Sequence, residues 1–275
     1  MLIVYFLNVK ITSMVTKVDV SNKNLTEAIN EAIAPLGGIS AFIGPGDKVF
    51  LKPNFNTSDP FPASSDLALL QAVCQIVSLQ KPSEIILGDS PTFFGNSKKY
   101  FEDTGAKNLE SEFENLKVVF LNDEPWISKP IPKGRFLKKA SIPAFIENID
   151  KIIYLPCLKT HSWAQYTGAL KLTVGLLKPI ERLKLHSGHL QEKIAELNNL
   201  ISPNLIIMDA RSCFINKGPT HGEIKKPNLI LASKSRVEID IEGVKIIQSY
   251  PGNSLEGIAA LELPQIKRAK ALNIN

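Results

Sequence analysis

Short, unbroken runs of Val, Ile and Leu alternate with stretches of helical periodicity along this chain, and this alternation constrains the fold most. The apolar runs predict strands at residues 48–51, 84–87, 117–121, 151–155, 205–208 and 228–232. Apolar positions three and four apart predict helices at 25–36, 66–79, 97–103, 164–176, 189–201 and 237–248. Strands without polar alternation are buried on both faces. The sequence therefore predicts an α/β fold: a mostly parallel sheet with helices on both faces.

The length of 275 residues suits one large domain or a main domain with an elaborated lobe. Prolines and a glycine interrupt residues 122–148, which predicts a less regular excursion or small lobe there. We expect residues 14–275 to form a single α/β domain. Residues 1–13 are expected to be a disordered extension, or one that results from the choice of start site, with Met14 then the true start.

Composition excludes several classes of protein. Hydrophobic residues make up 44% of the chain and charged residues 21%, which is typical of globular proteins and not of disordered or fibrous ones. No apolar run reaches the roughly 18 residues that a spanning helix needs, so no membrane segment is expected. The net charge of +5 is mild and its basic clusters lack interleaved aromatics, which argues against nucleic acid but suits a small anion.

Three scattered cysteines, Cys74, Cys157 and Cys213, fit neither a disulfide framework nor a metal motif. They indicate a reducing cytosol, and we expect no intrinsic iron–sulfur cluster. His186 and His189 are three apart, but no acidic or cysteine ligand stands at a matching spacing. Whether a metal binds is left open.

Polar residues follow the predicted strands. In open parallel sheets ligands bind beyond the carboxyl ends of the strands, so these residues are expected around one crevice. They are Lys52 with Asn54, Asp89 with Ser90, Asp123, Lys159 with His161, Asp209, and Ser233.

Lys159-Thr160-His161 is the sharpest local signal, because it pairs a cation with a group that ordinarily titrates near neutral pH. Lys171 interrupts an apolar run, and it either extends to water or is held by a carboxylate or an anionic ligand. Ser64 and Ser65 offer hydroxyl and N–H groups to an anion at a helix start.

Structural interpretations stay open beside these functional ones. A lysine at a strand end extends along apolar surface, Asp89 starts a turn before Pro91, and Ser64 and Ser65 cap the helix predicted at 66–79. A histidine in this position is also satisfied by packing and one hydrogen bond.

Taken together, the motifs resemble the family called domain of unknown function 362, whose members are often described as iron–sulfur center proteins. The resemblance runs from about residue 49 to 250 and rests on Val49-Phe50-Leu51-Lys52-Pro53-Asn54, Gly88-Asp89-Ser90, Lys159-Thr160-His161, Thr167-Gly168-Ala169-Leu170-Lys171 with Gly175, His186, Asp209, Gly218-Pro219, and Ala232-Ser233 with Asp240. Many members carry a ferredoxin-like module, which this chain lacks. It also has Leu172 where the family tends to have Asn.

We therefore expect a cytosolic small-molecule enzyme that binds an anionic substrate or cofactor at the strand ends. Lys52 and Lys159 would hold the anion, with Asn54, Ser64, Ser65 and Lys171 as further binding residues. His161 would act as general acid and base, and Asp89 or Asp209 would orient it or bind a metal. A redox reaction is implied by the resemblance alone. The alternative is a non-catalytic binding or electron-transfer partner of a separate ferredoxin-like protein.

Overall fold

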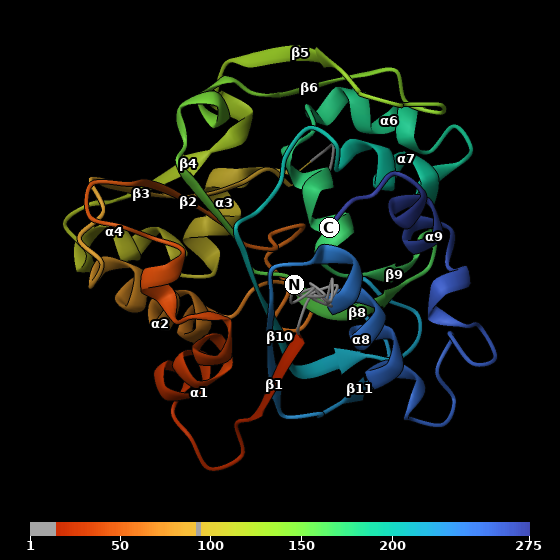
Figure 1. Ribbon diagram of the computed structural model, residues 1–275, viewed down its shortest axis with the longest axis horizontal. Coiled ribbons are helices and arrows are strands. Elements are labelled where there is room, and N and C mark those ends of the chain that lie inside the picture. Colours follow the sequence, from red (N-terminus) through yellow and green to blue (C-terminus); the bar gives the residue numbers. More distant parts are fainter. Residues whose placement is uncertain (1–14, 92–94) are drawn as a thin grey trace, which may run out of the picture.

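The computed structural model describes residues 15–91 and 95–275, and Figure 1 shows its ribbon. Its main sheet has the strand order β1-β12-β10-β7-β2-β3-β4. The predicted extension at residues 1–13 lies outside the described residues. The strands in this order are β1 (Val15–Asp19), β12 (Leu229–Ser233), β10 (Leu205–Phe214), β7 (Lys151–Tyr154), β2 (Lys48–Lys52), β3 (Glu84–Asp89) and β4 (Leu116–Phe120).

The strands from β10 to β4 run parallel, which confirms the predicted mostly parallel sheet. At the other side β12 pairs antiparallel with β10, and β1 pairs antiparallel with β12. Ser233, at the end of β12, consequently lies opposite Ile206 near the start of β10. The expectation that Ser233 joins the other strand ends is wrong, because β12 points in the opposite direction.

Both faces of the sheet are buried, and successive residues of one strand belong to different cores. Val49 and Leu51 of β2 pack into one core and Phe50 into the other, as a strand's period of two requires. The first core contains residues of helices α1 (Leu25–Ile33), α2 (Leu67–Ser78), α3 (Ser97–Asp103) and α4 (Leu109–Glu112). The second contains residues of α5 (Ala169–Leu172), α7 (Leu190–Leu197), α8 (Arg236–Gln248) and α9 (Pro264–Ala271).

A hairpin stands where the sequence predicted the start of a helix over 164–176. Strand β8 (Cys157–His161) pairs antiparallel with β9 (Gln165–Thr167), and α5 begins only after Gly168. The apolar spacing of this segment reflects alternate burial in a strand followed by one helical turn, so the helix prediction is wrong for its first part. Strand β10 likewise continues past residue 208 to pair with β8 and with β11 (Ile224–Lys225).

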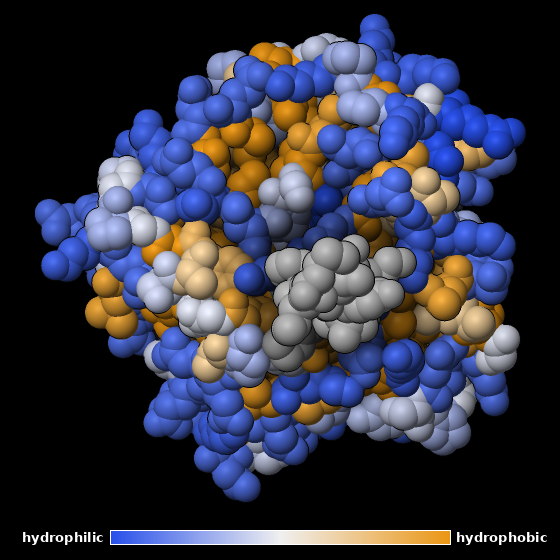
Figure 2. All heavy atoms as spheres, viewed as in Figure 1, coloured by the Kyte–Doolittle hydropathy of each residue, from blue (hydrophilic) through white to orange (hydrophobic). Residues whose placement is uncertain are grey.

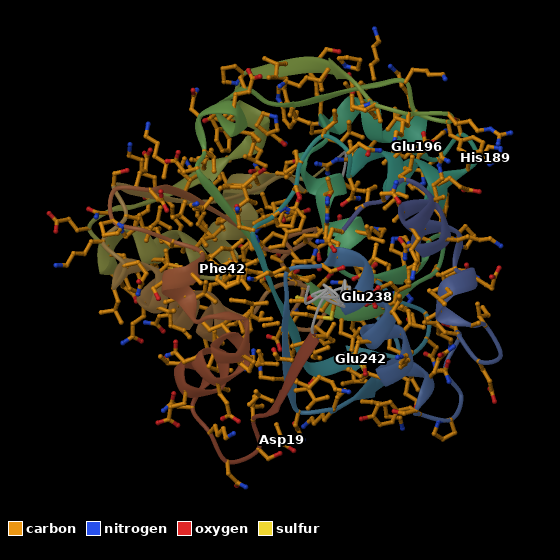
Figure 3. All side chains as sticks on the ribbon, viewed as in Figure 1. Asp19, Phe42, His189, Glu196, Glu238 and Glu242 are labelled. Carbon is orange, nitrogen blue, oxygen red and sulfur yellow. The ribbon has the colours of Figure 1, made fainter. Side chains whose placement is uncertain are left out.

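The excursion predicted at 122–148 contains a second, two-stranded sheet of β5 (Trp126–Pro130) and β6 (Lys139–Pro143), which arches over the top of the view in Figure 1. Glu196 of α7 fastens its loop (Figure 3), because the buried carboxylate accepts hydrogen bonds from the backbone N–H groups of residues 135, 136 and 137. Arg268 of α9 forms an ion pair with the same carboxylate, with 2.6 Å between its guanidinium nitrogen and Glu196 Oε1.

Most of the face shown in Figure 2 is hydrophilic, with smaller hydrophobic areas between the charged residues. The longest α-helix in the described ranges, α8, has 13 residues. Within residues 15–91 and 95–275 no helix is long and apolar enough to cross a membrane.

Candidate functional site

Neighbouring strands bring Lys52 and Asp89 together at their carboxyl ends. The Lys52 Nζ lies 2.6 Å from Asp89 Oδ1, and both side chains are buried. Asp89 also accepts hydrogen bonds from the N–H groups of Phe55 and Ser90, at 2.7 Å each. Burial raises the pKa of Asp89 and lowers the pKa of Lys52, while the ion pair opposes both shifts. The two opposite charges thus neutralise each other in a buried ion pair at the carboxyl ends of β2 and β3.

Gly175 permits the chain to pass directly over this pair. A Cβ at this position would stand 2.6 Å from both Asp89 Oδ1 and Lys52 Nζ, so a larger residue would displace the ion pair. The segment Thr173–Leu176 that carries Gly175 follows α5 immediately.

Lys159 is a buried cation whose donors are all engaged by the protein. Its Nζ donates to Asn54 Oδ1 at 2.7 Å, to the Pro62 carbonyl at 3.0 Å and to the Ala63 carbonyl at 2.5 Å. An ammonium group has three N–H donors, so none remains for a ligand. Burial lowers the pKa of Lys159 to about 8.

Arg182, at the start of α6 (Arg182–Leu185), is a second buried cation whose N–H donors are all engaged by the protein. A guanidinium group has five N–H donors. Those of Arg182 are directed at the carbonyl oxygens of Leu177, Ser90, Pro91 and Gly175 and at Ser90 Oγ. Arg182 could not be predicted as a site residue from the sequence, because nothing in its own segment shows that it reaches the end of β3.

Lys171 differs from both, since its Nζ makes no hydrogen bond or ion pair within the described part of the chain. It lies on α5, and Asp240 of α8 fixes that turn by accepting hydrogen bonds from the N–H groups of Ala169 and Leu170, at 2.6 and 3.0 Å. Burial, followed by the repulsion of Lys159 and Arg182, lowers the pKa of Lys171 to about 7. Lys171 therefore exchanges its proton near neutral pH.

Thr167 provides a second unsatisfied polar group. Its Oγ1 is buried and has no hydrogen-bond partner among the described residues. Thr167 lies on β9 directly opposite Lys159 on β8, and it lines the same cavity as Lys171. This hydroxyl is thus available in the cavity for a further hydrogen bond.

His161 is held in its neutral form. Its Nδ1 accepts hydrogen bonds from the N–H groups of Trp163 and Ala164, both at 3.1 Å, so the ring proton must be on Nε2. Burial, with the nearby cations Lys171 and Lys159, lowers the pKa of His161 to about 2. His161 thus presents an N–H donor, in place of the group titrating near neutral pH that its residue type suggested.

These side chains line two neighbouring cavities, which we call the inner and outer parts of one cleft because they share lining residues. The inner part, of about 50 Å³, is lined by Lys52, Asp89, Lys159 and Thr167 among others. The outer part, of about 570 Å³, is bordered by His161 and by apolar side chains including Trp163 and Leu190. Both parts share the lining residues Asn56, Lys171, Val174, Arg182 and Pro219, so Lys171 stands at their junction.

Several residues predicted from the sequence lie in or beside this cleft, and others do not. Lys52, Asn54, Asp89, Lys159 and Lys171 line the inner part and His161 the outer part. Asp209 is not among the lining residues: it lies within β10 and binds Arg211 at 2.7 Å, which in turn binds Asp66 at 2.6 Å.

The two predicted serines serve the loop that follows β2. Ser64 Oγ donates to the Thr57 carbonyl, and Ser65 Oγ accepts from the Asn54 N–H. They shape the loop whose carbonyls hold Lys159 and are not among the lining residues. Asp123 is exposed and borders a different pocket.

No group of three or more His, Cys, Asp or Glu side chains within residues 15–91 and 95–275 is arranged to hold a metal ion. Cys74 lies in α2, Cys157 begins β8 and Cys213 lies in β10, and all three are buried. His186 borders the outer cleft, whereas His189 stacks on Phe136 with ring centroids 4.2 Å apart.

Comparison with known proteins gives one family match. Residues 49–245 match the family described as "Domain of unknown function (DUF362)". The thylakoid-associated protein sll1697 of Synechocystis sp. (strain ATCC 27184 / PCC 6803 / Kazusa) is 26% identical over 251 residues, which cover 88% of this chain and 76% of the relative.

Two solved structures are similar at low identity. The lactate racemase apoprotein of Thermoanaerobacterium thermosaccharolyticum has a TM-score of 0.47 and 11% identity, over 86% of this chain and 62% of that one. A protein from Thermotoga maritima has a TM-score of 0.46 and 9% identity, over 90% and 59%. This chain thus spans less than two thirds of either solved chain.

Proposed function

This chain belongs to the domain of unknown function 362 family, and from its cleft we propose that it is a small-molecule enzyme that binds an anionic substrate. The charged head of the substrate occupies the inner part of the cleft, and its apolar body occupies the outer part. This proposal retains the anionic ligand and the binding role of Lys171 predicted from the sequence, but gives up the binding role predicted for Lys159.

The free Nζ of Lys171 is the observation that carries the proposal. Lys159 and Arg182 add positive charge beside it, but their donors are committed to protein oxygens. Lys52 donates to Asp89 and to the Pro53 carbonyl, which leaves one N–H. Positive potential in a cleft with low-dielectric walls attracts an anion, and Lys171 supplies the donors to bind it.

The shape of the cleft favours a carboxylate with an apolar side chain. The inner part has room for a group of carboxylate size, and Thr167 Oγ1 and the remaining Lys52 N–H are further donors there. The outer part is several times larger and is bordered by Trp163, Leu183 and Leu190. Because burial of apolar atoms adds to affinity, such a substrate gains from both parts.

Neutral His161 fits this function as a hydrogen-bond donor. Its Nε2–H serves to polarise an oxygen of the substrate. Because the pKa of His161 is lowered, the imidazole does this as an uncharged ring and not as an imidazolium. Asp89 acts through Lys52, whose position it fixes. The redox reaction implied by the family resemblance, and a cytoplasmic location, stay predictions.

The test is calorimetric titration with 3-phenylpropionate, and with 3-phenyl-1-propanol as its uncharged counterpart. Wild type should bind the acid in preference to the alcohol. Lys171→Met should weaken binding of the acid by about 1.5–3 kcal/mol, or roughly 10- to 150-fold, and leave the alcohol unaffected. Lys178→Met, at an exposed lysine of the same segment, is the control. Equal affinity of wild type and Lys171→Met for the acid would refute the proposal.

The alternative is a non-catalytic partner of a separate ferredoxin-like protein. The exposed Trp163 (69%) and Leu183 (53%) favour it, since a protein partner would cover them. Both also border the outer cleft, so the apolar body of a substrate accounts for them equally. The alternative predicts that a ferredoxin changes the fluorescence of Trp163 and that the carboxylate does not; the enzyme proposal predicts the reverse.

A further inference from the structure

We propose that Lys171 is an amine nucleophile that forms an imine with the carbonyl group of a 2-oxo carboxylate. This inference rests on the proposed function and narrows its substrate class. It assigns a covalent role to a residue that the sequence analysis placed only among binding residues.

The position of Lys171 in the cleft suits a 2-oxo acid. The residue borders both parts of the cleft, and the inner part takes the carboxylate. The carbonyl carbon next to that carboxylate then lies between the two parts, both of which Lys171 lines. The remaining side chain of the acid extends among the apolar residues of the outer part. A single molecule thus satisfies the inner donors, the amine and the apolar border.

The surroundings keep the Lys171 amine available. A lysine is a nucleophile only without its extra proton, and neighbouring cations in a dry site favour that form. The charged and titratable groups around it come from several elements: Lys159 and His161 from β8, Arg182 from α6, His186 after α6, and the Lys52–Asp89 pair from β2 and β3. Repulsion by Lys159 and Arg182 adds to burial in lowering the pKa of Lys171 to about 7. No described carboxylate binds Lys171 to oppose this.

The reaction is a condensation that needs no oxidant or reductant. The amine lone pair attacks the carbonyl carbon, a C–N bond forms, and the carbonyl π electrons move to the oxygen. The His161 Nε2–H donates a hydrogen bond to that oxygen as its charge develops. The two amine protons pass to the oxygen, the C–O bond breaks, and water leaves. The products are the imine and one water.

Borohydride trapping with phenylpyruvate tests this step. Reduction converts the imine to a stable secondary amine, which intact-mass measurement and peptide mapping locate. The variants are Lys171→Arg, which keeps the charge but loses the amine, and Lys171→Met, with Lys178→Arg as the exposed control. At pH 7.5 we expect labelling at Lys171 to be about ten- to hundredfold faster than at the average exposed lysine. The labelling rate at Lys171 should level off above about pH 7, whereas that of exposed lysines continues to rise.

The competing carboxylate 3-phenylpropionate separates the two proposals, because it lacks the carbonyl. An adduct at Lys171 that this acid suppresses, and that both Lys171 variants lack, supports the imine. An adduct spread over exposed lysines, or unchanged in the variants, overturns it. Absence of an adduct while 3-phenylpropionate still binds overturns the imine and leaves the proposed function standing. Absence of any binding overturns both.

Discussion

Lys159 and Lys171 both line the inner cleft, but only one of them has its N–H donors satisfied by the protein. Replacing Lys159 by Met leaves Asn54 Oδ1 and the carbonyls of Pro62 and Ala63 without their donor. Unsatisfied buried acceptors are costly, so we expect a loss of about 2–4 kcal/mol in the free energy of unfolding, measured by urea denaturation. Lys171→Met is the matched control: it leaves no protein acceptor without a donor, so it should not lose stability. A stable Lys159→Met protein would contradict the structural role given to Lys159.

The pKa of Lys171 also makes a prediction about stability and pH. Its pKa is about 7 in the folded protein, against an ordinary value of 10.5. Between these values the unfolded chain binds more protons at this residue than the folded one, so stability rises with pH there. Below pH 7 the lysine is protonated in both states and adds no slope. The difference in free energy of unfolding between wild type and Lys171→Met should thus shift in favour of wild type from pH 7 to 10, and a constant difference would show that this lysine has an ordinary pKa.

At the scale of single residues the sequence identified where charge gathers but not what each charge contacts. Lys52, Asp89 and Lys159 follow predicted strands, and this rule placed them correctly at the sheet's end. The N–H donors of Lys159 bind backbone carbonyls nearly a hundred residues earlier in the chain, and no local sequence pattern reveals such a contact. The neutral state of His161 likewise comes from the hairpin turn that follows it.

At the scale of elements, the short helix α5 depends on a contact from α8. Asp240→Ala removes the acceptor for the N–H groups of Ala169 and Leu170, and the first turn of α5 loses its anchor. We expect both a lower melting temperature and weaker binding of 3-phenylpropionate, because this turn positions Lys171. Glu238→Ala, at a side chain of α8 that is 39% exposed, should change neither. Unchanged binding of 3-phenylpropionate in a destabilised Asp240→Ala protein would show that this contact does not position Lys171.

The predicted strands and most helices could be read from apolar periodicity, because burial on both faces leaves a strong pattern. The hairpin of β8 and β9 could not, since Tyr166, Ala169 and Leu170 are three and four apart and so also fit a helical stripe. Only the pairing of β9 with β8 shows the strand. The antiparallel direction of β12 could not be predicted from the sequence either. A buried run of Leu229–Ser233 looks the same whether it runs parallel or antiparallel to its neighbour.

At the scale of the whole molecule, the cleft concentrates positive charge that the net charge of +5 only hints at. Among the described residues lining its inner part are Lys52, Lys159, Lys171 and Arg182, against the single carboxylate of Asp89. These residues come from β2, β3, β8, α5 and α6, and all lie within the stretch that matches the family. The fold therefore gathers at the carboxyl ends of the strands a group of cations that no single segment contains, and the proposed anion site depends on this group.

The most direct test of this account is a crystal structure after a bromide soak, at a pH below about 7 so that Lys171 is protonated. We expect the strongest anomalous peak in the inner cleft, within hydrogen-bond distance of Lys171 Nζ and Thr167 Oγ1. Crystals of Lys171→Met should lack this peak and keep any peaks at exposed lysines. Bromide found only at exposed lysines, with the inner cleft empty of it in wild type, would contradict the anion site on which the proposed function depends.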